Sequence, residues 1–228
     1  MECIFVLDIF NDAVVHAVRG ERAMYEPVHK HSWVVDSSDP IRVLEQVRPK
    51  KVYVADLNRL MGPGDNLKVL EAISLQAGTM ADVGIAQEKD LSFLPEKAVP
   101  VLGTETASLK LMKAIASQRP AIVSIDMKAR QIMTRDIHLA RDPLDVLLQL
   151  NGLPLEAVIL LELDRVGTSS GIDEAFLAEA VSASSHPLIL GGGVKGVKDL
   201  EVLNRLGFEG SLVATAVHNR SIPMEMLR

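Results

Sequence analysis

Short runs of apolar, mostly β-branched residues alternate along the chain with longer segments in which apolar residues recur at helical spacing. The runs predict strands at residues 4–7, 52–55, 80–83, 99–102, 121–125, 158–163, 188–190 and 211–214. The segments between them predict amphipathic helices at residues 40–47, 66–75, 108–117, 143–150, 174–182 and 197–206, with a shorter and weaker one at 87–93. Because a helix between two strands returns the chain to the same edge of a sheet, the alternation predicts parallel strands.

The chain also repeats itself across its middle. The segment VLDIFNDAVV around Asp8 resembles SIDMKARQIM around Asp126, since in both an apolar run ends in Asp and a polar break leads to a second apolar stretch. Three more pairs follow in the same order: DLNRL with ELDRV, VGI with GGV, and GTETA with ATAVH. Four strand-ending motifs repeated twice predict an eight-stranded (βα)8 TIM barrel made of two half-barrels, about 1–118 and 119–228. No Pro/Gly/Ser-rich linker interrupts the series, so we expect one domain over residues 1–228.

The predicted topology indicates where chemistry can occur. In such barrels the loops that follow the carboxyl ends of the strands build the active site. Polar residues at or just beyond these ends are Asp8, Asp56, Asp82, Thr104, Asp126, Glu162 and Asp164.

The strongest candidates for chemistry are Asp8 and Asp126. They end strands that stand opposite each other in the predicted ring, so their carboxylates are expected to face across its mouth. Such a pair suits general acid and base catalysis if one carboxyl stays protonated while the other is ionised. The alternative is that each Asp caps its own loop through bonds to backbone amides. The symmetry of the pair favours catalysis.

Glycine clusters predict where an anion would bind. The GGGV segment with Gly192 and Gly193, together with Ala214 and Thr215, follows the last two strands, where such barrels hold phosphate. Glycine lets backbone amides approach an anion closely. Corresponding candidates on other strands are Gly84, Gly103, Thr104, Asp56, Asp164, Gly167 and Thr168, together with Gly20, which lies between two arginines. Two pseudo-symmetric sites would hold a ligand with a phosphate at each end, whereas the alternative for each cluster is an ordinary turn.

Composition and charge narrow the class of protein. The chain has 228 residues, 48% of them hydrophobic, which is enough for the core of a short barrel. With a net charge of −6 and scattered basic residues, no basic stripe indicates a nucleic-acid partner. No apolar segment reaches the roughly 20 residues that span a membrane, and no signal peptide is evident. The lone Cys3 fits a cytoplasmic protein, and the histidines lack metal-ligand spacing, so neither a metal nor another cofactor is expected.

At this point the motifs resemble a known family. The segments VLDIFNDAVVHAVRGER, VADLNRLMGPGDN, DVGIAQEKD, VLGTETA, SIDMKA, LELDRVGTSSGID, LILGGGV and LVATAV are similar, in order and over nearly the whole chain, to those of the HisA/HisF barrels of histidine biosynthesis. The likeness is closer to the isomerase HisA, which converts a phosphorylated aminoaldose to an aminoketose by an Amadori rearrangement. The resemblance implies a phosphorylated small-molecule substrate, Asp8 as general base, Asp126 as general acid, and glycine loops that hold phosphate.

Several positions depart from the family pattern. Leu161 stands where the family usually has Thr, Val166 where it has Asp, and Ala86 where a GGGIR-type loop carries Arg. The last loop has Ala214 and Thr215 where the family reads GRA. A site that lacks this hydroxyl and carboxylate cannot make the same hydrogen bonds to a substrate. The pattern predicts a divergent HisA-related paralogue.

Three hypotheses follow. The first is an isomerase that acts on a phosphorylated sugar or aminosugar by proton transfer between Asp8 and Asp126. The second is the histidine-pathway ribotide isomerase itself, which Leu161 and Val166 disfavour. The third is a non-catalytic barrel that binds a phosphate ligand or acts as a scaffold, which the retention of both aspartates disfavours.

Overall fold

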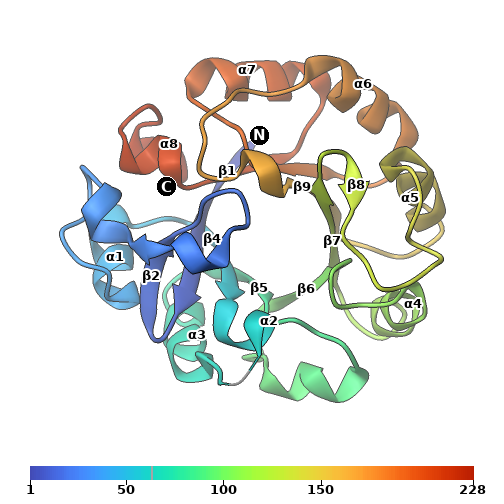
Figure 1. The fold of residues 1–228 in the computed structure, drawn as a ribbon, viewed down its shortest axis with the longest axis horizontal. Helices are drawn as coiled ribbons and strands as arrows, with labels where there is room; N and C mark the ends of the chain where they lie inside the picture. Colours follow the sequence, from blue (N-terminus) through green and yellow to red (C-terminus); the bar gives the residue numbers. More distant parts are fainter. Residues whose placement is uncertain (63) are drawn as a thin grey trace.

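Eight parallel strands form a closed ring in the computed structural model, which describes residues 1–62 and 64–228 (Figure 1). Around the ring they are β1 Glu2–Phe10, β4 Lys51–Asp56, β5 Gly78–Asp82, β6 Val99–Gly103, β7 Ile122–Lys128, β9 Ala157–Glu162, β10 Leu188–Gly191 and β11 Gly210–Val213. Pairing of β1 with β11, from Glu2 opposite Gly210 onwards, closes the barrel. The predicted fold is therefore confirmed, and each predicted strand overlaps an observed one, with bounds that differ by at most three residues.

Helices surround the ring and return the chain between strands (Figure 1). They are α1 Pro40–Val47, α3 Leu67–Ser74, α4 Leu109–Ala116, α5 Pro143–Leu150, α6 Glu174–Ala183 and α7 Val197–Leu206, close to the predicted ranges. Helices α1, α4, α5 and α6 start at side-chain caps, as where Asp39 accepts a hydrogen bond from the amide of Arg42. The weak segment at 87–93 forms the 3-10 helix η3 Glu88–Phe93 instead of an α-helix.

Short elements that periodicity did not predict stand at the carboxyl-terminal ends of the barrel strands. They are α2 Leu57–Met61, η4 Leu163–Arg165 and α8 Thr215–His218, with η1 Arg22–Met24, β3 Glu26–Pro27 and η2 Val28–His31 in the long first loop and η5 Met224–Leu227 at the end of the chain. Each is five residues or fewer. Such short pieces cannot show a helical repeat of apolar positions.

Two of the barrel strands extend into hairpins at equivalent places in the two halves. Strand β1 turns back into β2 Ala13–His16, and β7 turns back into β8 Gln131–Ile132. Each turn has two residues of positive φ, Asn11 (49°) and Asp12 (60°) in the first and Ala129 (49°) and Arg130 (63°) in the second, as in type I′ turns. The polar break seen twice in the sequence is therefore a two-residue hairpin turn.

The core has two layers. Side chains such as Ile4, Tyr53 and Ile159 fill the inside of the barrel, and a larger cluster packs the outer face of the strands against the helices. Cys3 belongs to the outer cluster and is buried, as expected for a core residue.

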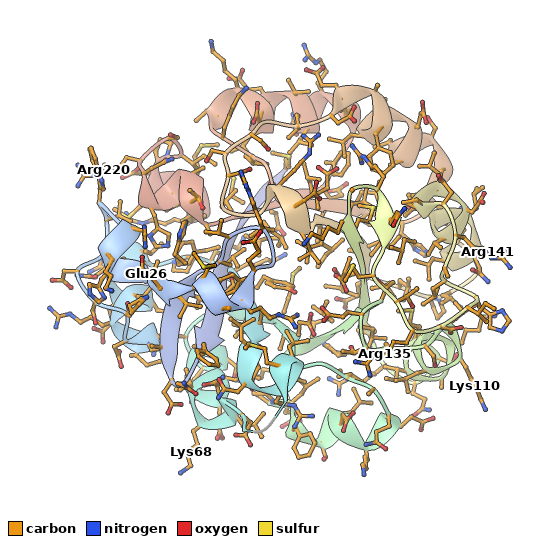
Figure 2. All side chains as sticks on the ribbon, viewed as in Figure 1. Glu26, Lys68, Lys110, Arg135, Arg141 and Arg220 are labelled. Atoms are coloured by element: carbon orange, nitrogen blue, oxygen red, sulfur yellow. The ribbon has the colours of Figure 1, made fainter. Side chains whose placement is uncertain are left out.

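The outer surface carries separated charges. Lys68, Lys110, Arg141 and Arg220 extend away from the barrel on different sides (Figure 2). In the described part of the chain, helices are all too short or too polar to cross a membrane.

Candidate active site

A pocket of about 340 Å³ opens at the carboxyl ends of the strands. Residues at or beyond the ends of all eight barrel strands line it. The predicted residues among them are Asp8, Gly20, Gly103, Asp126, Gly167, Gly192, Gly193, Ala214 and Thr215. Because these residues come from both halves of the chain, the pocket exists only when the ring is closed.

The two aspartates of the repeat both line the pocket, but their surroundings differ. Asp126 is only 4% exposed. One of its oxygens accepts a hydrogen bond of 2.6 Å from the Ser124 hydroxyl, and the other accepts one of 3.2 Å from the Glu105 amide. Asp8 is partly buried, and its carboxylate accepts no hydrogen bond from the described residues. Asp126 is thus held in place by the protein, whereas Asp8 is free to accept bonds from a ligand.

A third carboxylate, that of Asp82, completes the acidic side of the pocket. It accepts hydrogen bonds from the Tyr53 hydroxyl at 3.2 Å and from the Gly84 amide at 3.1 Å. Burial raises its pKa to about 6, although both hydrogen bonds favour the ionised form. The sequence places Asp82 at a strand end but does not predict a catalytic or binding role for it. Its position opposite Gly191 in the internal repeat is the signal that could have identified it.

Gly103 makes room for two of these carboxylates. A Cβ atom at this position would lie 2.8 Å from Oδ2 of Asp126 and 3.5 Å from Oδ2 of Asp82. The first distance is too short for a real contact, so a side chain at position 103 would displace the Asp126 carboxylate from its hydrogen-bonded position.

The pKa values of both repeat aspartates lie near neutrality. Burial raises the pKa of Asp8 to about 7, with the Arg22 guanidinium opposing the shift and the charge of Asp82 adding to it. Burial also raises the pKa of Asp126 to about 7, with a further rise from Asp82 and an opposing hydrogen bond from Ser124. Two carboxyls with such values can share the protonated and ionised roles at pH 7.

The long first loop crosses the mouth near these carboxylates. Arg22 of η1 forms an ion pair of 2.9 Å with Glu105, which follows β6. Tyr25 lines the pocket as well, and burial followed by the charge of Asp8 raises the pKa of its phenol, so the hydroxyl stays a donor. The loop therefore places the Arg22 guanidinium and the Tyr25 hydroxyl at the acidic side.

Hydrogen-bond donors gather on the opposite side, at the ends of β10 and β11. Within the described residues, the amides of Thr215 and Ala216 have no acceptor, as expected for the first turn of a helix. The Ser169 hydroxyl, in the loop after β9, is buried against the pocket and has no partner among these residues either. The amide of Gly193 is already engaged, since it donates to the Arg165 carbonyl at 3.1 Å.

The glycines here are required by their backbone. Gly192 and Gly193 have φ angles of 94° and 84°, and a Cβ on either would lie 2.5 Å from a carbonyl oxygen. Gly167 is similar, because a Cβ would lie 2.3 Å from the Ala17 carbonyl oxygen. These glycines shape the wall of the pocket. This structural role is the alternative to anion binding that the sequence left open for each cluster.

Asp56, which the sequence predicts as a ligand-binding residue, lies outside the pocket lining. Tyr53 and Ala55 face the inside of the barrel, so Asp56, the next residue along β4, points to the other face. Its carboxylate accepts hydrogen bonds from the amide and the side chain of Asn66, at 2.8 and 2.6 Å, and from the Arg59 amide. Asp56 therefore caps α2 and fixes the following loop, which is the alternative raised for strand-end aspartates.

Four other predicted binding residues also lie off the pocket lining. The Thr104 hydroxyl accepts a hydrogen bond of 2.9 Å from the Asp126 amide, so it supports the site from behind. The Gly84 amide donates a hydrogen bond to the Asp82 carboxylate. Asp164 is exposed on η4, and the Thr168 hydroxyl donates to the Arg165 carbonyl.

The positions that depart from the family pattern differ in whether they line the pocket. Leu161 and Val166 line the pocket and make one wall apolar, whereas Ala86 is exposed and lies outside the lining. A Cβ on Gly191 would lie 2.7 Å from Cδ1 of Leu161, so this leucine fills space that glycine leaves open.

Histidines from the first loop and from α8 adjoin the donor side. His16 Nε2 lies 3.4 Å from the Thr215 hydroxyl, and its ring stacks on His31 with centroids 4.6 Å apart. Burial, helped by the charge of His16, lowers the pKa of His218 to about 4, so His218 stays neutral at pH 7. Across residues 1–62 and 64–228, no three His, Cys, Asp or Glu side chains lie close enough together to hold a metal ion.

Comparison with known proteins agrees with this architecture. A family model described as "Histidine biosynthesis protein" matches residues 2–223. The chain belongs to this family. Its resemblance to HisA and HisF is thereby confirmed at the level of the family.

Relatives within the family span almost the same length. An uncharacterized protein of Methanocaldococcus jannaschii is 30% identical and aligns over 99% of this chain and 96% of its own. A phosphoribosyl imidazole-4-carboxamide isomerase of Methanosphaera stadtmanae is 24% identical over 99% and 97% of the two chains. The corresponding isomerase of Myxococcus xanthus is 25% identical over 96% and 94%. Two of these relatives are thus named as isomerases, and this chain is a distant member of the same family.

Proposed function

We propose that the protein is an isomerase that converts a phosphorylated aldose or aminoaldose to the corresponding ketose, with Asp8 and Asp126 transferring the protons. The observation that carries the proposal is that these carboxyls line one pocket from opposite strands, each with a pKa of about 7. A general acid and a general base work best when their pKa values lie near the operating pH.

The different surroundings of the two carboxyls suggest their roles. A protonated Asp126 would donate its proton to the ring oxygen of the sugar, which opens the ring. An ionised Asp8 would remove the proton from C2, next to the resulting protonated imine or carbonyl at C1, and so give an enaminol or enediol. Asp8 would then return this proton to C1 while the C2 hydroxyl gives its proton to Asp126, so that the ketone forms at C2 and both carboxyls regain their starting states. Asp8 suits the base because none of the described residues donates a hydrogen bond to its oxygens. Asp126 suits the acid because Ser124 and Glu105 hold it in one orientation.

The ends of β10 and β11 are proposed to hold the substrate phosphate. The free amides of Thr215 and Ala216 and the unpartnered Ser169 hydroxyl are the donors that support this assignment. Gly192, which lines the pocket without a side chain, allows close approach.

The apolar wall supports the proposal of a substrate different from that of the named relatives. Leu161 and Val166 offer no hydrogen bonds, so a substrate with polar groups on that side would lose its bonds to water without replacement. We therefore propose a smaller or less polar sugar phosphate in place of the imidazole carboxamide ribotide.

The test is an isomerisation assay over a panel of aldose and aminoaldose phosphates. Asp8→Asn and Asp126→Asn should each lower turnover by roughly 100-fold, since a positioned acid or base typically contributes at least that much. Asp145→Asn, at an exposed position on α5, is the matched control and should retain full activity. Inertness of wild type and both variants across the panel would instead favour a non-catalytic phosphate-binding barrel.

The histidine-pathway substrate is tested separately. Wild type should fail to complement a strain that lacks the pathway isomerase, and Leu161→Thr combined with Val166→Asp should raise any trace activity on that substrate. Full complementation by wild type would make the chain a pathway isomerase with relaxed recognition.

A further inference from the structure

The two halves of the pocket arise from one repeat but differ in charge. Where the second half has Gly191, the first has Asp82, and where the second has Ala216, the first has Glu105. Asp82 and Glu105 both line the pocket. The loops that present backbone amides in one half therefore carry carboxylates in the other.

These loops face each other across the mouth. In the ring order, β5 and β6 stand four strands away from β10 and β11, so they lie on opposite sides of the barrel. A ligand held by its phosphate at β10 and β11 would thus direct its other end toward Asp82 and Glu105.

On the acidic side, the backbone amides of the loop after β6 are already engaged within the protein. The Glu105 amide donates to the Asp126 carboxylate at 3.2 Å, and the Thr104 amide donates to the Ser124 carbonyl at 2.9 Å. The equivalent amides of the second half, those of Thr215 and Ala216, have no acceptor within the described residues. In the first half of the chain, the loop after β6 thus has these amides paired with acceptors of the protein itself.

The charge on that side is also unfavourable to an anion. Asp8, Asp82, Asp126 and Glu105 all line the pocket, and the nearby cation Arg22 is paired with Glu105 at 2.9 Å. Arg19 of the first loop and Lys128 at the end of β7 also line the pocket, but both are exposed residues. Like charges brought together in a desolvated site oppose binding strongly.

We infer that the substrate carries a single phosphate, bound at β10 and β11, and that its opposite end presents hydroxyl or amino groups to Asp82 and Glu105, with Glu105 as the residue that excludes a second phosphate. This inference rests on the proposed function only in taking the pocket as the substrate site. It names the substrate class as sugar or aminosugar monophosphates.

Calorimetric titration at pH 8 tests the inference by binding, without turnover. Ribose 5-phosphate serves as a monophosphate with hydroxyl groups, glucosamine 6-phosphate as one with an amino group, and fructose 1,6-bisphosphate as the probe with a phosphate at each end. We expect at least one monophosphate to bind wild type about tenfold or more tightly than the bisphosphate, because like-charge contacts are costly.

Variants then isolate Glu105. Glu105→Gln leaves Arg22 without its ion-pair partner, so it should raise the affinity for the bisphosphate by about fivefold to tenfold and change the affinity for monophosphates much less. Glu96→Gln removes the same charge from an exposed position ahead of β6 and should change neither.

The outcomes separate this inference from the proposed function. Tightest binding of the bisphosphate to wild type, an equal effect of both Gln variants, or no binding of any monophosphate at millimolar concentration would each overturn it. A monophosphate preference without any turnover would uphold it while removing the isomerase proposal.

Discussion

Asp82 connects the charge of the pocket to the protonation of the two proposed catalytic residues. Its charge raises the pKa of both Asp8 and Asp126, after the larger effect of burial. Because the three carboxyls share one site, their titration is coupled, and a rate profile will report apparent values of the group.

Replacing Asp82 should therefore move the pH optimum. Asp82→Asn removes the charge, so the apparent pKa values that limit kcat/KM should fall, and the bell-shaped profile should shift toward acid by about half to one pH unit. The amide oxygen can still accept a bond from Tyr53, so the geometry should persist. The test is to measure kcat/KM against pH for wild type, for Asp82→Asn and for the exposed control Asp145→Asn. An unchanged profile would show that Asp82 acts only as a structural group.

The residue scale was the least predictable from the sequence. Asp56 and Asp82 both end apolar runs, yet one caps a helix and the other lines the pocket. The difference arises because successive side chains of a strand point to opposite faces of the sheet, and because the Asn66 side chain donates a hydrogen bond to the Asp56 carboxylate. Asn66 belongs to a different segment, so no local pattern reveals the contact.

At the scale of elements, the two type I′ hairpins are the clearest product of the repeat. They extend β1 and β7 beyond the ring and bring residues such as His16 and Lys128 to the pocket. The second hairpin places Ala129 at a φ of 49°, where a side chain with Cβ is unfavourable.

Relief of this strain should stabilise the protein. Ala129→Gly should raise the free energy of unfolding by about 0.5 to 1 kcal/mol, because glycine adopts positive φ without a steric cost. Ala13→Gly, in strand β2 after the equivalent turn, is the control and should lower it by about 0.5 to 1 kcal/mol. Urea unfolding measures both. A loss of stability at Ala129 would mean that chain entropy outweighs the strain.

Long elements were predicted well and short ones were missed. Helices α1, α5 and α7 have the predicted bounds because capping residues and apolar spacing act within one segment. Helix α8 has four residues and sits where β11 ends against the first loop, so only packing defines it. The strands β2 and β8 were visible in the sequence only as a second apolar stretch after each strand-end aspartate.

At the scale of the whole molecule, the buried carboxylates of the pocket lower the free energy of unfolding at neutral pH. The pKa values of Asp8, Asp82 and Asp126 in the folded protein, about 7, 6 and 7, lie above the ordinary value of 3.8. The folded state therefore holds these protons more tightly than the unfolded state. The stability that results is fully present below about pH 4 and is lost as the pH rises toward 7.

Removing one of these charges should recover part of that stability. Asp8→Asn should raise the free energy of unfolding at pH 8 by about 1 to 2 kcal/mol, less than the full pKa shift implies because water in the open pocket screens the charge. At pH 4 the difference should nearly vanish, since Asp8 is then protonated in the folded state. Urea unfolding at both pH values measures this, and a variant less stable than wild type at pH 8 would contradict a burial penalty at Asp8.

The sequence by itself determined the closed barrel, its two halves and the pair Asp8 and Asp126 at opposite strand ends. These features depend on periodicity and repetition, which each segment carries locally. Only the tertiary structure decided which strand-end groups line the pocket and which donors remain free. That outcome depends on contacts between distant segments, such as the bond of Glu105 to Asp126 and its ion pair with Arg22, which turn one half of a symmetric fold acidic.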